Sequence, residues 1–173
     1  GGELIDDLLD LLRRQVDILI TAGQRHEQLL ILRLHQFLQQ LALLGVDYFE
    51  VGMMHYIDSV DEFRACLDGS YYEYVQELLS AGTIRHIGLS THNPEVALEA
   101  ARREVVEVIM FSINPAFDLM PASEDVNDLF GDFEEAGEQM EPLRAELYSL
   151  CEEKEIALTV MKPYAGGRLL MDE

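Results

Sequence analysis

Apolar residues follow two kinds of spacing along this chain, one typical of helices and the other typical of buried strands. Helical spacing predicts helices over residues 3–15, 25–44, 71–80, 94–103 and 142–153. Short apolar runs between them predict strands over residues 17–21, 47–54, 84–89, 105–113 and 156–161. These runs are mostly continuous instead of alternating, which is typical of strands buried on both faces. The pattern therefore predicts an α/β fold in which helices cover a parallel sheet of five strands.

The length of the chain limits which parallel architecture is expected. A complete (β/α)₈ barrel takes about 250 residues. This chain has 173 residues, so the pattern fits either a doubly wound open sheet or a section of a barrel. We expect one domain over residues 1–173. Residues 119–141 interrupt the alternation of predicted strands and helices, and they contain eight acidic residues, two glycines and one proline. They predict an acidic loop excursion over the face of that domain.

Charge and composition argue against several functional classes. The chain carries 12 Lys and Arg against 33 Asp and Glu, a net charge of −21, which argues against binding to nucleic acid or to an anionic membrane surface. No apolar run has the length of a membrane span, and no basic-then-apolar leader opens the chain. Its two cysteines, Cys66 and Cys151, are too few for a disulfide framework or a four-thiolate metal site. We expect a cytoplasmic protein without a bound metal.

Small, polar or ionisable residues follow each predicted strand, where parallel α/β proteins gather their active sites. They are Thr21, Ala22 and Gly23 after the first strand; His55, Tyr56 and Asp58 after the second; Ser90, Thr91, His92 and Asn93 after the third; Ser112, Asn114 and Asp118 after the fourth; and Lys162, Pro163, Tyr164, Gly166 and Gly167 after the fifth. Polar residues are common at strand ends, so this placement alone leaves an active site and an ordinary loop edge equally open.

Four segments, in this order, resemble the aldo/keto reductase family. They are residues 44–56 (LGVDYFEVGMMHY), 82–94 (GTIRHIGLSTHNP), 108–118 (VIMFSINPAFD) and 160–169 (VMKPYAGGRL). The resemblance covers roughly residues 17–171 and is strongest to a bacterial branch whose members often carry a ferredoxin-like 4Fe-4S tail. It implies a (β/α)₈ barrel that is incomplete here, because the five predicted strands resemble barrel strands three to seven. The family reaction is NADPH-dependent reduction of a small-molecule carbonyl.

The resemblance implies roles for residues near the predicted strand ends. His55 stands where the family has the histidine that orients and polarises the substrate carbonyl. Ser90 and Thr91 resemble the pair that hydrogen-bonds the nicotinamide carboxamide. Asn93 has a second interpretation, as the N-cap of the helix that begins at Pro94.

The loop after the last predicted strand resembles the family loop that lies along the cofactor pyrophosphate. In this loop, Lys162 would supply positive charge, and Gly166 and Gly167 would let the backbone approach a phosphate closely. The resemblance therefore implies NADP(H) as the cofactor.

Other parts of the family pattern have no counterpart in this sequence. The family histidine works with an aspartate, with a tyrosine that donates the proton, and with a lysine that lowers the pKa of that tyrosine. Residues 21–24 (TAGQ) stand where this lysine is expected, and the aspartate and tyrosine belong to a strand that is not found. No cysteine cluster of a ferredoxin-like tail is found either, so no iron–sulfur centre is implied. We expect a reductase-type domain with weak or no activity as an isolated chain.

Two alternatives stay open, a non-catalytic binding or assembly module and a truncated remnant of the family. A five-stranded section of a barrel has two open strand edges, and such edges need to be paired or covered. Self-association into a homo-oligomer would cover them.

Overall fold

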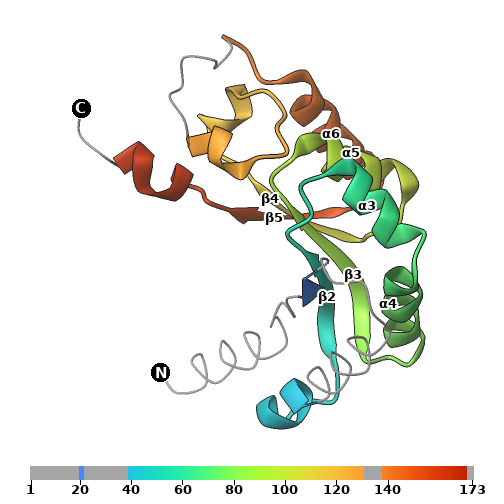
Figure 1. The fold of residues 1–173 in the computed structure, drawn as a ribbon. Helices are drawn as coiled ribbons and strands as arrows, with labels where there is room; N and C mark the ends of the chain where they lie inside the picture. Colours follow the sequence, from blue (N-terminus) through green and yellow to red (C-terminus); the bar gives the residue numbers. More distant parts are fainter. Residues whose placement is uncertain (1–19, 22–38, 131–137, 171–173) are drawn as a thin grey trace.

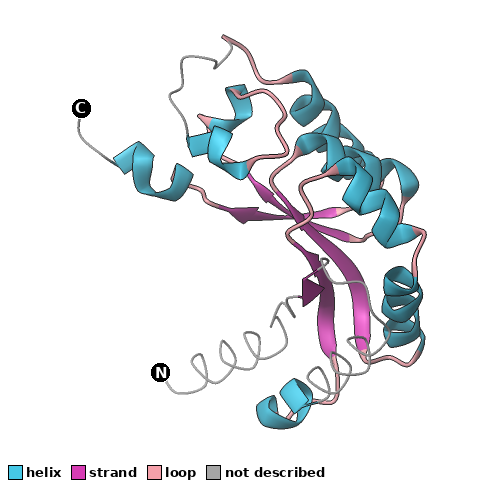
Figure 2. Cartoon of the chain, in the orientation of Figure 1, coloured by secondary structure: helices cyan, strands magenta, loops and turns pink. Residues whose placement is uncertain are grey.

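The structure, a computed structural model, describes residues 20–21, 39–130 and 138–170. In these residues it contains one five-stranded sheet, in the order β1-β2-β3-β4-β5, and every neighbouring pair is parallel. The strands are β1 (Ile20–Thr21), β2 (Phe49–His55), β3 (Ile84–Thr91), β4 (Val108–Ser112) and β5 (Ala157–Met161). The predicted parallel α/β sheet is confirmed, and its strands lie side by side in chain order (Figures 1 and 2).

The register brings the carboxyl ends of the strands to one edge of the sheet. Thr21 pairs with His55, Thr91 pairs with Phe111, and Ser112 pairs with Met161. Since parallel strands all run the same way, the loops that follow them leave from this one edge. Residues far apart in the sequence can therefore meet there.

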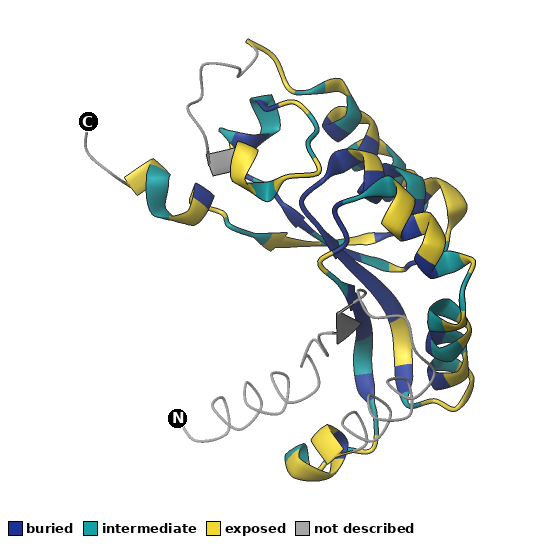
Figure 3. Cartoon of the chain, in the orientation of Figure 1, coloured by how far each residue is buried: buried dark blue, intermediate teal, exposed yellow. Residues whose placement is uncertain are grey.

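Four helices lie along one side of the sheet (Figure 1). They are α3 (Val60–Leu67), α4 (Ser70–Ser80), α5 (Pro94–Arg103) and α6 (Pro142–Glu153). Their buried residues, which include Phe63, Val75, Leu98 and Leu147, pack in one cluster with strand residues such as Ile87, Leu89 and Ile109. Figure 3 shows buried segments in the middle of the sheet and in the helices beside it. Burial of this apolar face, at about 25 cal/mol per Å², supplies the main stabilisation of the fold.

The helix predictions are confirmed where the structure describes them, with one addition. Helices α4, α5 and α6 agree with the ranges 71–80, 94–103 and 142–153. Residues 39–44 are helical, while the predicted helix over residues 3–15 and the rest of the one over 25–44 lie outside the described residues. The sequence pattern missed α3. The strand predicted over 105–113 begins at Val108, because Glu104 ends α5 in a left-handed conformation and residues 105–107 then connect the helix to the strand.

The acidic excursion over residues 119–141 is anchored at both ends. The backbone N–H of Glu141 donates to the carbonyl of Asp118 at 2.7 Å, so the two ends of the excursion lie together. Its described part contains a short 3₁₀ helix over Val126–Phe130, and Met120 packs with Phe117 and Ala165. Residues 131–137 lie outside the described residues. The beginning of the excursion thus packs against the loop that follows β5.

A buried arginine ties α6 to the end of β4. Arg144 is 0% exposed, and its Nη1 donates to the carbonyl of Ser112 at 2.8 Å. Its guanidinium also faces Asp118, at 3.4 Å, and lies over the ring of Phe111. Tyr148 donates its hydroxyl to Asp118 at 2.6 Å, and both burial and this hydrogen bond raise the pKa of Tyr148. These contacts fix the loop after β4, which borders the strand edge described below.

Among the described residues, no helix combines the length and the apolar character that crossing a bilayer requires.

Candidate functional site

The carboxyl edge of the sheet carries two histidines on either side of a tyrosine. His55 is the last residue of β2, and His92 follows the last residue of β3. The ring of Tyr56 lies 6.4 Å from the ring of His55 and 5.6 Å from that of His92, to which it is nearly perpendicular. His92 is 5% exposed, whereas Tyr56 is 51% exposed at the rim. The sheet therefore places both imidazoles at the edge where the sequence predicts an active site.

A buried carboxylate, Asp58, organises the loop after β3. It accepts hydrogen bonds from the Thr91 hydroxyl at 2.9 Å and from the backbone N–H of His92 at 2.6 Å. A third contact joins its other oxygen to Nδ1 of His92 at 3.0 Å. The Asn93 side chain donates to the backbone carbonyl of Asp58 at 2.8 Å. The loop after β2 and the loop after β3 are thereby held as one unit.

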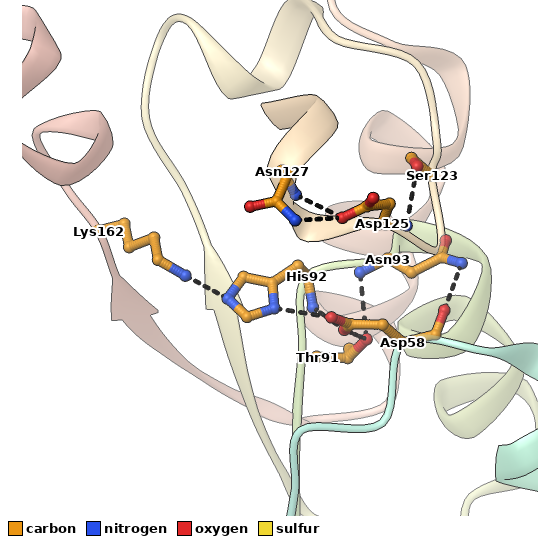
Figure 4. Close-up of polar contacts among 8 residues, drawn as sticks. All are labelled: Asp58, Thr91, His92, Asn93, Ser123, Asp125, Asn127 and Lys162. Carbon is orange, nitrogen blue, oxygen red and sulfur yellow. Dashed lines mark hydrogen bonds and ion pairs between the residues drawn. The ribbon is translucent and has the colours of Figure 1, made fainter. Parts of the chain in front are cut away.

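His92 connects this unit to the loop after β5. An ionised carboxylate only accepts hydrogen bonds, so Nδ1 of His92 carries the proton and Nε2 presents its lone pair. The ammonium of Lys162 contacts Nε2, which completes a chain of contacts from Lys162 through His92 to Asp58 (Figure 4). Asn114 fixes the backbone of the lysine, because its side-chain amide donates to the Lys162 carbonyl at 3.0 Å. The ends of four strands thus contribute to one polar cluster, which consists of Asp58, Thr91, His92, Asn93, Asn114 and Lys162.

Burial and charge shift the pKa values of both ends of this cluster. Burial by itself raises the pKa of the Asp58 carboxyl, but the hydrogen bonds from the His92 side chain and backbone, together with Thr91, outweigh it, so the pKa lies below its ordinary value. Burial lowers the pKa of Lys162, and the negative charge of Asp58 partly offsets this. Asp58 therefore stays ionised at neutral pH.

The Ser90 and Thr91 pair lies in the same cluster but is buried. Their exposed fractions are 1% and 0%. The Ser90 carbonyl accepts from the backbone N–H of Ile57 at 3.1 Å, and the Thr91 hydroxyl accepts from the backbone N–H of Asn93 at 3.1 Å while it donates to Asp58. The Thr91 hydroxyl thus joins the loop after β2 to the first turn of α5 and is enclosed by them.

Asn93 is the N-cap of α5. Its side chain accepts from the backbone N–H of Glu95 at 2.9 Å, and Pro94 stands in the first turn. The capping interpretation of the sequence is therefore confirmed. The same side chain also donates to Asp58, so the cap and the polar cluster share one residue.

Two residues at the same edge of the sheet have a left-handed backbone, which is strained for a residue other than glycine. Among the described residues, Tyr56, Glu104, Glu155, Lys162 and Ala165 are the non-glycine residues with positive φ. Glu104 and Glu155 stand at helix ends, where a left-handed residue is common. Tyr56 (φ 58°) and Lys162 (φ 52°) directly follow β2 and β5. Such residues cost about 1 kcal/mol each and gather at functional sites.

The two glycines after β5 also have positive φ, 68° at Gly166 and 97° at Gly167. They interrupt a short 3₁₀ segment, Ala165–Leu170, and a methyl group built at Gly167 would meet no atom within 4 Å. The backbone therefore turns beside open space, at a position that a side chain would leave strained.

The roles of the six predicted site residues stay predictions, and the sequence analysis missed the cluster that connects some of them. His55, Ser90, Thr91 and Lys162 lie at or next to strand ends, and Gly166 and Gly167 follow in the same loop. Asp58 and His92 were recognised only as residues after strands, without a role. The signal for their pairing was weak, because an Asp three positions after His55 and a His after Ser-Thr are also common loop residues.

A model of the aldo/keto reductase family matches residues 33–173 of this chain. A comparison with curated proteins finds no match.

Solved structures share the fold. An aldo/keto reductase from Klebsiella pneumoniae, in complex with NADP and acetate, is 17% identical with a TM-score of 0.54; the match covers 96% of this chain and 50% of that one. The holo form of an aldo-keto reductase from Bacillus halodurans is 22% identical with a TM-score of 0.52, over 77% and 36% of the two chains. An aldo-keto reductase of the silkworm, Bombyx mori, is 15% identical with a TM-score of 0.51, over 98% and 47%. The chain spans half or less of each structure's length, so its sheet is a section of a (β/α)₈ barrel, as predicted.

Proposed function

This chain belongs to the aldo/keto reductase family, and on that premise we propose that it serves the NADPH-dependent reduction of a small-molecule carbonyl. One observation carries the proposal. The carboxyl ends of β2, β3 and β5 bring an imidazole, a hydroxyl pair and an ammonium to a single edge of the sheet. Carbonyl reduction by hydride needs groups of these kinds, namely a polariser for the oxygen and partners for the cofactor.

In this proposal His55 polarises the substrate carbonyl. Hydride transfer to the carbonyl carbon leaves negative charge on the oxygen, which then takes up a proton to give the alcohol. An imidazole N–H directed at that oxygen stabilises the charge as it develops. His55 ends β2 directly before the left-handed Tyr56, so the strand fixes its backbone.

The described residues fit a nicotinamide cofactor, which supplies the hydride when it is bound. Lys162 would hold a phosphate by its charge, and the open turn at Gly166 and Gly167 would let the backbone approach the pyrophosphate. The resemblance assigns Ser90 and Thr91 to the carboxamide, but both are buried in this structure, at 1% and 0% exposure, so this contact stays a prediction of the resemblance.

We propose that turnover by this chain is weak. The family's tyrosine proton donor has no match among the segments that carry the resemblance, and loss of a general acid costs about two to four orders of magnitude in rate. Binding of the cofactor and chemistry are therefore expected to respond differently to substitution.

The test separates binding from turnover. NADPH binding is measured by the fluorescence of the nicotinamide, and turnover by its absorbance in the presence of a panel of aldehydes and quinones. We expect binding by the wild type and by His55→Ala, with slow NADPH oxidation in the wild type alone. His86→Ala is the matched control. His86 lies near the amino end of β3, away from the carboxyl edge that carries His55, and it pairs with the exposed Glu107. No NADPH binding at millimolar concentration would refute the proposal.

A second candidate, an assembly module, is favoured by the exposure of β5. Among the described residues β5 pairs only with β4, and Val160, next to the last residue of β5, is 54% exposed. An open edge of this kind invites pairing with another chain. Sedimentation decides this candidate: we expect a dimer that Val160→Lys dissociates, and a wild-type monomer at all concentrations would exclude it.

A further inference from the structure

The side chain of Lys162 is held in place before any ligand binds. Its backbone carbonyl accepts from Asn114, at the end of β4, and its ammonium reaches past β4 to His92, at the end of β3 (Figure 4). A lysine side chain normally samples many rotamers, and this freedom is lost when it binds a ligand. A lysine that is already fixed loses less entropy on binding, so it binds more tightly.

His92 can hold this ammonium only in one tautomer, and Asp58 selects that tautomer. The carboxylate accepts a hydrogen bond from the Nδ1–H of His92, so Nε2 is the acceptor that faces Lys162. The backbone N–H of His92 and the Thr91 hydroxyl hold the carboxylate in turn, and both Asp58 and His92 are at least 94% buried. A histidine that only filled space in the core would need the contact with Asp58 and not the one with Lys162.

We propose that His92 is a positioning residue which, oriented by Asp58, holds the Lys162 ammonium for the phosphate groups of the nicotinamide cofactor. This inference rests on the proposed function, since it takes Lys162 as the phosphate-binding cation. His92 itself does not contact the cofactor in this arrangement. Asp58, after β2, and His92, after β3, together hold the ammonium of Lys162 in place on the loop after β5.

Two substitutions at His92 separate its two contacts. The amide of Asn overlays the Nδ1 side of an imidazole, so His92→Asn keeps a donor toward Asp58 and loses the acceptor toward Lys162. The amide of Gln extends to the Nε2 side, so His92→Gln restores an acceptor for Lys162. A structural role predicts that Asn is the better replacement, whereas the positioning role predicts that Gln is.

The first measurement needs no ligand. The chain has two lysines, Lys154 and Lys162, and the rate at which an acylating reagent modifies each is read by mass spectrometry and divided by its rate in urea-unfolded chain. We expect Lys162 to be protected in the wild type and in His92→Gln, and several-fold less protected in His92→Asn. Protection of Lys154, which pairs with Glu104, should not change. The lowered pKa of Lys162 also changes its intrinsic acylation rate, so the comparison between variants is the test. Equal protection of Lys162 in the wild type and in His92→Asn overturns the proposal.

The second measurement is NADPH affinity. We expect His92→Asn to weaken binding about tenfold, which is the order of one charge-assisted contact, and His92→Gln to recover most of it. Lys162→Met should weaken binding at least as much, and adding His92→Asn to it should cost nothing more, because the two substitutions remove one interaction.

The outcomes distinguish this inference from the proposed function. If Lys162→Met weakens NADPH binding but His92→Asn stays within twofold of the wild type, His92 does not position the lysine and the proposed function stands. If Lys162→Met binds like the wild type, the inference is wrong for a different reason, since Lys162 is then no phosphate ligand. A wild-type chain that binds no NADPH overturns the proposed function and this inference with it.

Discussion

Asp58→Asn is the substitution that tests the polar cluster most directly. Asn keeps one carbonyl oxygen, which can still accept from the Thr91 hydroxyl and from the backbone N–H of His92, both of which donate to the same oxygen in the wild type. Its NH₂ group replaces the oxygen that faces Nδ1 of His92. The new NH₂ group and the Nδ1–H of His92 are then two donors that face each other without an acceptor between them. If His92 changes tautomer to relieve this, its Nε2–H opposes the ammonium of Lys162, so one contact is lost in either case.

The magnitude follows from the strength of these bonds. Hydrogen bonds to a charged group contribute about 1.5–3 kcal/mol and neutral ones about 1 kcal/mol. Asp58→Asn weakens two charge-assisted bonds and removes a third, so we expect the free energy of unfolding to fall by about 3 kcal/mol after allowing for the easier burial of an uncharged side chain. For a chain of this size, 1 kcal/mol moves Tm by about 2–4 °C, which gives a fall of about 6–12 °C.

Urea unfolding followed by circular dichroism measures this difference at neutral pH. The midpoint should fall while the m-value stays constant, because the surface exposed on unfolding does not change. Asp61→Asn is the matched control, since Asp61 is exposed in the first turn of α3, and we expect it to change stability by less than about 0.5 kcal/mol. A loss below about 1 kcal/mol for Asp58→Asn would show that the cluster does not stabilise the fold and that our interpretation of its hydrogen bonds is wrong.

Three further predictions concern the same region. The folded-state pKa of Asp58 is lowered, so the stabilisation by its carboxylate is complete above the unfolded pKa of about 4 and is lost as pH falls through the lower folded pKa. The difference in unfolding free energy between the wild type and Asp58→Asn, measured by urea unfolding, should therefore stay constant from about pH 6 to 8 and disappear below about pH 4. Tyr148→Phe removes the hydrogen bond to Asp118 and should cost about 1–2 kcal/mol in the same assay, whereas the exposed Tyr164 serves as a control, with Tyr164→Phe expected to cost less. Gly167→Ala should cost about 1 kcal/mol, because φ is 97° there while the space around it is open; a neutral result in thermal unfolding would mean that the turn adjusts.

Much of the fold could be predicted from the sequence, because apolar runs and helical spacing report directly on burial. Helix α3 could not, since it has only eight residues and buries only Phe63 and Cys66. Its signal was Ser59 followed by Glu62, the spacing of a capping box, although Ser59 makes no side-chain cap in the structure. Short helices of this kind depend on packing against the sheet more than on their own sequence.

The positions of the candidate site residues at strand ends were predictable one by one, but their contacts were not. Hydrophobic patterns indicate where a strand ends, and so they placed His55 and Lys162 at strand ends. Hydrophobic patterns do not indicate which strand ends lie next to each other in the sheet. Asp58 and His92 are 34 positions apart, and His92 and Lys162 are 70 apart. Such pairs depend on strand order and register, which the spacing of apolar residues leaves undetermined.

The position of Lys162 therefore depends on the whole sheet. β4 lies between β3 and β5, so the lysine reaches His92 only when β5 pairs with β4 in the observed register, Ser112 beside Met161. Asn114, two residues beyond that pair, then holds the Lys162 carbonyl while His92 holds its ammonium. A shift of one residue would turn every side chain of β5 to the opposite face and break both contacts. The polar cluster at the carboxyl edge and the pairing of the exposed strand β5 thus depend on each other, and the Lys162 charge that we propose for a phosphate is in position only when β5 is paired with β4.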